Sequence, residues 1–293
     1  MLKTWKSSTP LAIVALIGIT VIWGWSFTII KRAITKIPVM DFLSLQFAVA
    51  VLAMVILRPT CFKNISLRDI RRGIILGALL GLAYIMQTFG LRTTPAAVSG
   101  FITGMSVVFT PVIAWLILHD GIYLKTWLSV ALATIGLALL SLHGWSFGRG
   151  ELLTLGCAIL FALYIVGLGK WSAEHDSYKL AVVQLGTAAV ICLIAAAPEG
   201  IVMPPDTSVW IAVGIIAILA TALAYLVQTW AQSLISPTHT AVIMTMEPVF
   251  AGVFAVALGH ERLTVRLIAG AICVLAAMFI IRIKSNVRKS RKW

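Results

Sequence analysis

Long runs of apolar residues, separated by short clusters of charged residues, dominate the pattern along this chain of 293 residues. A helix that crosses a hydrocarbon core needs about 20 apolar residues, and the runs have this length. They lack the alternation of apolar and polar residues that is typical of membrane β-barrels. The pattern therefore predicts ten transmembrane helices, near residues 11–30, 40–57, 70–91, 95–118, 122–141, 150–169, 178–197, 207–232, 236–258 and 264–282.

Composition supports a membrane protein independently of the pattern. Hydrophobic residues make up 60% of the chain, charged residues 11%, and the mean hydropathy is +1.03. A soluble domain normally contains about 25% charged residues. Lys3 and Lys6 precede the first apolar run as in a signal peptide, but the run is long and Lys31-Arg32 closes it, so we expect an uncleaved helix.

The chain also repeats itself. Residues 73–88 and 214–229 are identical at eight of sixteen positions when the sequence is shifted by 141 residues. Apolar composition alone would give about two matches, so the similarity indicates duplication. The identical pairs include Gly73 with Gly214, Tyr84 with Tyr225, and Gln87 with Gln228. A second offset of 138 gives a weaker signal nearer the N-terminus, where it pairs Gln46 with Gln184.

Duplicated membrane units are typical of secondary transporters. Each copy holds five predicted helices, and because five is odd, the second copy must enter the membrane from the opposite face. The predicted fold is therefore an all-α integral membrane protein of ten helices in two inverted five-helix repeats. The first repeat covers residues 10–141, the second covers 150–283, and a basic cytoplasmic tail covers 284–293.

The basic residues predict the orientation. Sixteen of the 23 Lys and Arg residues fall on the side of the N-terminus and seven on the other side. The positive-inside rule then places both termini in the cytoplasm, with the protein in the cell inner membrane. The net charge of +13 is explained by anionic lipids of the inner leaflet, without nucleic acid as a partner.

Several function classes lose support for lack of motifs. The chain has no Walker motif, HExxH or GxSxG, and its four cysteines lack metal-ligand spacing. We therefore expect neither an enzyme nor a nucleotide-driven pump, with no catalytic residues, no cofactor and no metal. A passive channel or uniporter stays open as an alternative. A membrane-embedded enzyme would need a set of catalytic groups at depth, and only one central carboxylate is found.

The motifs Trp23-Gly24 and Glu247-Pro248-Val249, the latter followed by Glu261, resemble the EamA-type family of the drug/metabolite transporter superfamily. The resemblance covers nearly the whole chain. It departs from the family pattern at Asp120, where a glutamate is usual, and at Gln46, where an arginine is common. It implies a ten-helix exporter of small metabolites or drugs that works by alternating access around a central cavity.

Glu247 is the strongest single candidate, because ionisable groups at membrane depth are costly and usually functional. It precedes Pro248, which frees the carbonyl of Met244 and favours a helix break; Pro111 is expected to break the fourth span. A carboxylate here could hold a proton in a dry state and release it to water, which predicts proton coupling. The alternative is a glutamate that only stabilises the break.

The candidate substrate-binding residues are Trp23, Tyr84, Gln87, Tyr164, Tyr225, Gln228 and Glu247. A spacing of three places each Tyr–Gln pair on one helix face, and inverted repeats place these faces across a pseudo-two-fold axis. The alternatives are hydrogen bonds that only bridge helices, and aromatic residues that anchor at the interface. We expect a monomer or homodimer that exports a small-molecule substrate, an amino acid or a similar amphipathic compound.

Overall fold

The computed structural model describes residues 9–94, 96–119, 123–141, 148–257 and 264–282, which form helices and no strand. The first half contains α1 (Thr9–Ala33), α2 (Val39–Leu57), α3 (Leu67–Thr93), α4 (Ala96–Gly104), α5 (Ser106–Leu118) and α6 (Leu124–Ser141). The second half contains α7 (Arg149–Trp171), α8 (Ser177–Ala196), α9 (Thr207–Ile215), α10 (Ala224–Gln232), α11 (Pro237–Met244), α12 (Met246–Ala257) and α13 (Val265–Arg282). The short helices are η1 (Pro59–Phe62), η2 (Ser172–Glu174), η3 (Ala197–Glu199) and the π-helix η4 (Ile216–Leu223), which joins α9 to α10.

Seven helical stretches in the described ranges are long and apolar enough to cross a membrane. They are Thr9–Ala33, Val39–Leu57, Leu67–Thr93, Val98–Leu118, Arg149–Glu174, Ser177–Ala196 and Thr207–Gln232. The other three expected spans lie in α6, in α11 with α12, and in α13, whose described apolar stretches are shorter. The protein is therefore a multi-pass membrane protein, and many of its exposed side chains are apolar, such as Leu57 and Leu124.

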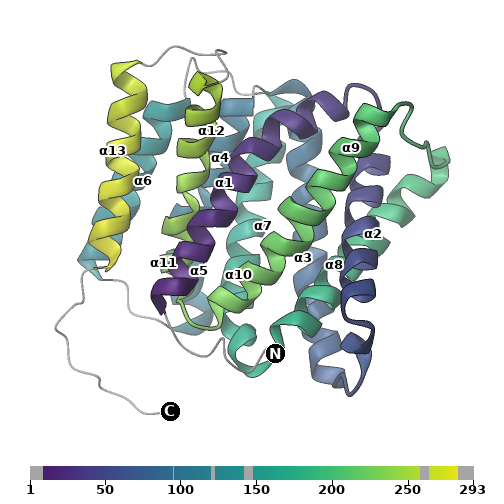
Figure 1. Cartoon of the computed structure of the whole chain (residues 1–293). Helices are drawn as coiled ribbons and strands as arrows, with labels where there is room; N and C mark the ends of the chain where they lie inside the picture. The colour runs from purple at the N-terminus through teal and green to yellow at the C-terminus, as the bar shows by residue number, and fades with distance from the viewer. Residues whose placement is uncertain (1–8, 95, 120–122, 142–147, 258–263, 283–293) are drawn as a thin grey trace.

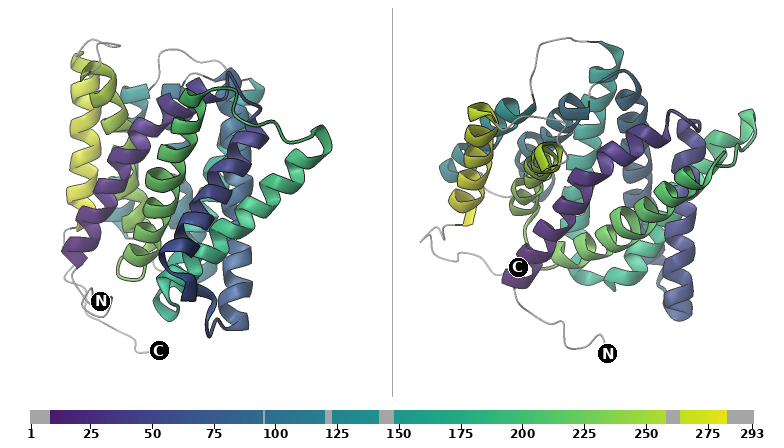
Figure 2. Two further views of the ribbon diagram at one scale, coloured as in Figure 1. Left: turned by 45° about the vertical axis from the view of Figure 1, so that its right-hand side comes forward. Right: turned by 45° about the horizontal axis from the view of Figure 1, so that its top comes forward.

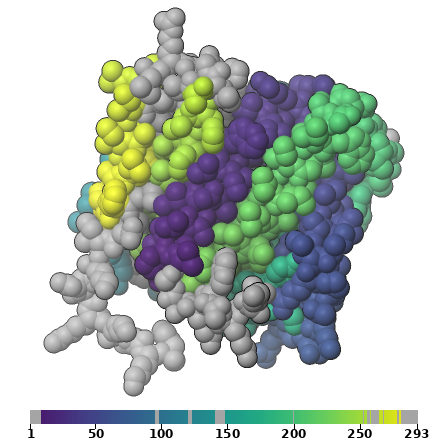
Figure 3. All heavy atoms as spheres, viewed as in Figure 1, coloured from purple at the N-terminus to yellow at the C-terminus, as the bar shows by residue number. Residues whose placement is uncertain are grey.

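The helices form one bundle (Figure 1). α6 and α13 lie side by side at one edge, and α2 and α8 pack together at the opposite edge, an arrangement that persists in the turned views of Figure 2. α1 crosses the front face diagonally beside α9 and α10 (Figure 3). The core between these elements combines helices from both halves of the chain.

Glycines bring α3 against α8. A Cβ atom at Gly77 would collide with the backbone oxygen of Gln184, and one at Gly73 would lie 2.5 Å from Val183. Gly81 faces Ala188 in the same way. The small residues on this face of α3 let α8 approach closely, with packing in place of the hydrophobic drive that lipid abolishes.

Ion pairs join the two halves at both ends of the bundle. Lys36, after α1, lies 2.8 Å from Asp206, which caps α9. At the opposite end Arg58, after α2, lies 3.3 Å from Asp176, which caps α8. A further pair, Arg72 with Glu174 at 2.6 Å, lies at the same end as Arg58.

Candidate functional site

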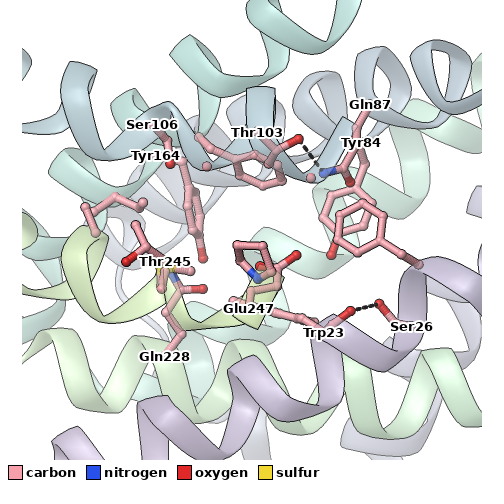
Figure 4. Close-up of a pocket in the computed structure, with 18 of the residues that line it drawn as sticks. Trp23, Ser26, Tyr84, Gln87, Thr103, Ser106, Tyr164, Gln228, Thr245 and Glu247 are labelled. Atoms are coloured by element: carbon pink, nitrogen blue, oxygen red, sulfur yellow. Dashed lines mark hydrogen bonds between the residues drawn. The ribbon is translucent and has the colours of Figure 1, made fainter. Parts of the chain in front are cut away.

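A cavity lies in the middle of the bundle (Figure 4). Its walls come from α1, α3, α4, α5 and α7 and from α10, α11 and α12, so both halves contribute. It holds about 850 Å³ of empty space, its open part included. It brings together eight of the nine residues that the sequence singled out: Trp23, Tyr84, Gln87, Tyr164, Tyr225, Gln228, Glu247 and Pro248.

The cavity extends toward one end of the bundle. Tyr164 and Gln228 line its inner part, while Ile30 and Leu91 lie in the last turns of α1 and α3. At this end the Lys31 ammonium donates to the carbonyl of Thr94 at 3.2 Å, which ties α1 to the end of α3.

Two tyrosines that are equivalent in the repeat meet at the wall of the cavity. The Tyr225 hydroxyl donates to the Tyr84 hydroxyl at 3.0 Å, and the ring centroids lie 6.1 Å apart. The two residues are separated by 141 positions, the offset of the repeat. Equivalent residues can touch only where the two copies face each other, so the cavity lies at the junction of the halves.

The two glutamines make equivalent contacts. Gln87 Nε2 donates to Thr103 Oγ1 at 3.2 Å, and Gln228 Nε2 lies 3.9 Å from Met244 Sδ. Thr103 and Met244 are also 141 positions apart. The same contact is therefore made twice, between α3 and α4 and between α10 and α11. Each amide both lines the cavity and bridges helices, so the two expected roles coincide.

An aromatic contact is repeated as well. The ring of Trp23 lies 5.6 Å from that of Tyr225, and the ring of Phe161 lies 5.8 Å from that of Tyr84. Phe161 follows Trp23 by 138 positions, the weaker offset of the sequence. Phe161 was not among the predicted residues, although this offset points to it.

The indole of Trp23 is fixed by an irregular helix. Its Nε1 donates to the carbonyl of Ala220 at 2.8 Å, within the π-helix η4. The Ala224 N–H bonds to Leu219 and Thr221 instead, which leaves the Ala220 carbonyl for the indole. Such π-segments are frequent at functional sites. Trp25 has 38% of its surface exposed and does not line the cavity.

Tyr164 is held by a buried chain of hydrogen bonds. Its hydroxyl donates to Gln184 Oε1 at 3.1 Å, and Gln184 Nε2 donates to Thr229 Oγ1 at 2.9 Å. The Tyr164 ring also packs 6.0 Å from that of Tyr225. Gln184 thus joins α7, α8 and α10 behind the cavity wall, a role for which its pairing with Gln46 in the sequence was only a weak signal.

Glu247 lies beside a helix interruption. α11 ends at Met244 and α12 begins at Met246, which places Glu247 in the first turn of α12. The partial positive charge at a helix N-terminus favours a carboxylate there. Pro248 follows within the same turn, where its missing N–H costs no intrahelical bond. The predicted break is therefore present, just ahead of the proline.

Gly24 explains why α1 reaches this interruption. A Cβ atom at Gly24 would lie 2.7 Å from the backbone oxygen of Glu247 and 2.8 Å from the nitrogen of Ala251. Only a residue without a side chain allows so close a crossing. The motifs Trp23-Gly24 and Glu247-Pro248 are therefore two sides of one helix contact at the cavity.

The expectation for Pro111 was wrong. The corresponding interruption in the first half falls at Met105, and Pro111 lies inside the continuous helix α5. A proline removes one backbone hydrogen bond, and this single loss does not end the helix. The hydroxyl of the adjacent Thr110 donates to the carbonyl of Ser106 at 2.7 Å. Pro111 is buried and lies outside the cavity lining.

Comparisons with known proteins identify the family. The model of the EamA-like transporter family matches residues 10–142 and 148–283. This chain belongs to the EamA-like transporter family. An uncharacterized transporter of Archaeoglobus fulgidus is 32% identical over 94% of this chain and 85% of its own, and the uncharacterized transporter YvbV of Bacillus subtilis is 25% identical over 97% and 95%. A solved structure named only as a crystal structure of a protein shares the fold, with a TM-score of 0.79, 15% identity and coverage of 94% and 97%.

The EamA family and the names of these relatives point to a membrane transporter rather than an enzyme.

In this EamA protein Gln46 does not line the cavity; it is buried and donates to Thr221 Oγ1 at 2.9 Å. His239 lies in the first turn of α11 beside its capping residue Ser236. Asp120, His260 and Glu261 lie outside the described residues. Across the described ranges, no three His, Cys, Asp or Glu side chains form a group suited to a metal.

Proposed function

We propose that this EamA-family protein is a secondary transporter that exports a small amphipathic metabolite, an amino acid or a related compound, by alternating access. The observation that carries the proposal is the cavity at the junction of the two halves, where Tyr84 meets Tyr225. Transporter sites are commonly built at such a junction of repeats. Aromatic rings offer an apolar surface, and the amides and hydroxyls offer hydrogen bonds to a polar group.

We further infer ten transmembrane helices in two inverted repeats, residues 10–141 and 150–283. Support comes from contacts that recur at the repeat offsets: Gln87–Thr103 with Gln228–Met244, and Trp23–Tyr225 with Phe161–Tyr84. With both termini in the cytoplasm of a cell with an inner membrane, α1 and α3 end on the outer side. The cavity then extends outward, and the ion pairs at the opposite end hold the cytoplasmic side together.

Glu247 is our candidate for proton coupling. It is the only acidic residue among the described residues that line the cavity. A carboxylate that alternates between a dry and a wet environment can take up a proton in one access state and release it in the other. Its place in the first turn of α12, against Gly24 of α1, connects this chemistry to a helix contact that rocking would change.

The test is solute uptake by proteoliposomes with and without an imposed pH gradient, after counterflow has identified a transported amino acid or amine. Wild-type accumulation should follow the gradient. Glu247→Gln should abolish gradient-driven accumulation and leave counterflow measurable, because glutamine keeps the size of the side chain and removes its titration. Ser106→Ala, at the equivalent position of the first repeat, should retain accumulation. Wild-type uptake that ignores the gradient would indicate a uniporter or channel instead.

A further inference from the structure

The described lining of the cavity has an acidic side chain but no basic one. Glu247 is the one charged side chain among the described residues of the lining, which include no Lys, Arg or His. Within the described part of the chain its carboxylate has no ion-pair or hydrogen-bond partner. A partly buried negative charge is costly unless a positive group pairs with it, so this position favours a cationic partner.

A second acceptor, the amide oxygen of Gln228, is also left open. The carbonyl of Ile165 can only accept, so the NH₂ group of Gln232, at 2.8 Å, must face it. Gln232 Oε1 then accepts from Gln228 Nε2 at 3.0 Å. This chain fixes the orientation of the Gln228 amide and leaves its Oε1 without a partner, in a residue that is 1% exposed. Buried acceptors without a donor are rare in folded proteins.

Several donors around the cavity, by contrast, are already in use. Groups of four lining residues donate within the protein: Trp23 to Ala220, Gln87 to Thr103, Tyr164 to Gln184, and Tyr225 to Tyr84. A solute therefore meets two unpaired acceptors, whereas these four donors are already bonded within the protein. This balance favours a ligand that donates hydrogen bonds and carries positive charge.

The open acceptors lie close to aromatic faces. In Figure 4 the Gln228 amide and Glu247 lie on the same side of the cavity, with Tyr164 opposite and Trp23 beside Glu247. Tyr84 and Phe161 continue the aromatic wall. The faces of aromatic rings attract cations and also receive apolar groups.

We propose that the cavity binds its solute as an organic monocation, with a protonated amine between the Glu247 carboxylate and the Gln228 amide oxygen and an apolar group against the rings. This rests on the proposed transport function and, of the substrates proposed there, favours amines that lack a free carboxylate over free amino acids. A free amino acid would bring a carboxylate into a lining whose described residues supply no cation for it. Burying that second negative charge beside Glu247 is the step that disfavours the zwitterion.

The test uses four probes of one shape with purified wild-type protein: phenethylamine, phenylalanine, 3-phenylpropionate and 2-phenylethanol. Isothermal titration calorimetry at neutral pH should show phenethylamine binding at least ten-fold more tightly than each of the other three. Equal or tighter binding of phenylalanine or 3-phenylpropionate overturns the proposal, and so does a failure of phenethylamine to bind. This comparison needs no variant, so it does not depend on any substitution folding.

Variants then assign the contacts. Glu247→Gln should weaken the binding of phenethylamine at least ten-fold and leave the binding of 2-phenylethanol unchanged. Gln228→Leu should weaken the binding of the amine several-fold. Asp41→Asn, at a buried acid outside the lining, should change the binding of neither probe. An equal loss of affinity for the amine and the alcohol in Glu247→Gln overturns the assignment of Glu247 to the amine. Binding of the amine without counterflow would refute transport while the cation site stands; counterflow of zwitterions alone would refute the cation site while transport stands.

Discussion

The two halves of the molecule interrupt equivalent helices at equivalent places with different chemistry. In the first half α4 gives way to α5 at Met105, and Ser106 follows; in the second half α11 gives way to α12 at Thr245, and Glu247 occupies the position 141 residues after Ser106. Both residues line the cavity. The interruption belongs to the duplicated scaffold, because it forms with and without a nearby proline. The charge was not duplicated, so the symmetric frame carries an asymmetric site.

The packing of equivalent glycines also differs between the two halves. Gly73 lies tightly against Val183, whereas a Cβ atom at its repeat equivalent, Gly214, would meet nothing within 4 Å. The second half instead contains the π-helix η4, which presents a carbonyl to Trp23. Gly73 is therefore required for close packing in the first half, whereas its equivalent Gly214 is not required for packing in the second half.

The largest expected effect comes from Gly24, which holds α1 against the charged interruption. In Gly24→Ala the new Cβ atom meets backbone atoms that no side-chain rotation can move, so α1 and α12 must separate. Overpacking of this kind costs about 1–3 kcal/mol, and displacement of Glu247 should also impair transport. The measurement is the Tm of the detergent-solubilised protein together with counterflow. Gly18→Ala on the same helix meets nothing within 4 Å and is the matched control; equal losses in both variants would contradict the close contact.

A smaller difference is expected between repeat-equivalent glycines. Gly73→Ala should destabilise the protein by about 1–2 kcal/mol, because Val183 is β-branched and cannot turn away freely. Gly214→Ala should be neutral or stabilising by up to about 1 kcal/mol, the helix propensity of alanine over glycine. Thermal unfolding of the two variants in the same detergent measures the difference, and identical Tm shifts would show that the halves pack alike.

Smaller effects are expected at the two amides of the cavity, which should contribute less free energy to solute binding than the glycine contacts contribute to stability. Gln87→Ala and Gln228→Ala each remove one amide from the wall, worth about 1 kcal/mol or several-fold in solute affinity. Gln228→Ala should cost more, since its oxygen is open to a ligand while Gln87 already bonds Thr103. Titration calorimetry gives the affinities. Variants that bind normally but unfold at a lower temperature would assign both amides to helix bridging alone.

The sequence predicted most of this site because polar groups at membrane depth and repeated pairs are visible without a structure. Tyr84, Gln87, Tyr225 and Gln228 were found through the repeat, and Glu247 through its depth. The π-helix was not predictable, since residues 214–229 resemble residues 73–88, which form a regular helix in α3. Within the π-helix the Ala220 carbonyl accepts a hydrogen bond from Trp23 and the Thr221 hydroxyl accepts one from Gln46, and both donors are distant in sequence. The interruption at Met105 likewise has no local proline to mark it.

The smallest expected effect lies at the exposed ion pair between Lys36 and Asp206. Bonding to the Lys36 ammonium, to Ser208 and to the Val209 N–H lowers the pKa of Asp206 below its ordinary value of 3.8. A lowered pKa means that the stabilisation is present above pH 3.8 and is lost as the pH falls below it. Asp206→Asn should therefore lower the Tm slightly at neutral pH and have no effect in acid. A larger shift in acid than at neutral pH would contradict this sign.

The central claim, that the solute sits in the cavity between the halves, is tested most directly by protection from alkylation. In a variant whose four native cysteines are replaced by alanine, Gln87→Cys places a thiol in the cavity and Thr207→Cys places one at an exposed helix start at the same end. Phenethylamine, or the solute found by counterflow, should slow maleimide labelling of Gln87→Cys at least several-fold and leave Thr207→Cys unchanged. Labelling of Gln87→Cys that is indifferent to a bound solute would contradict the account.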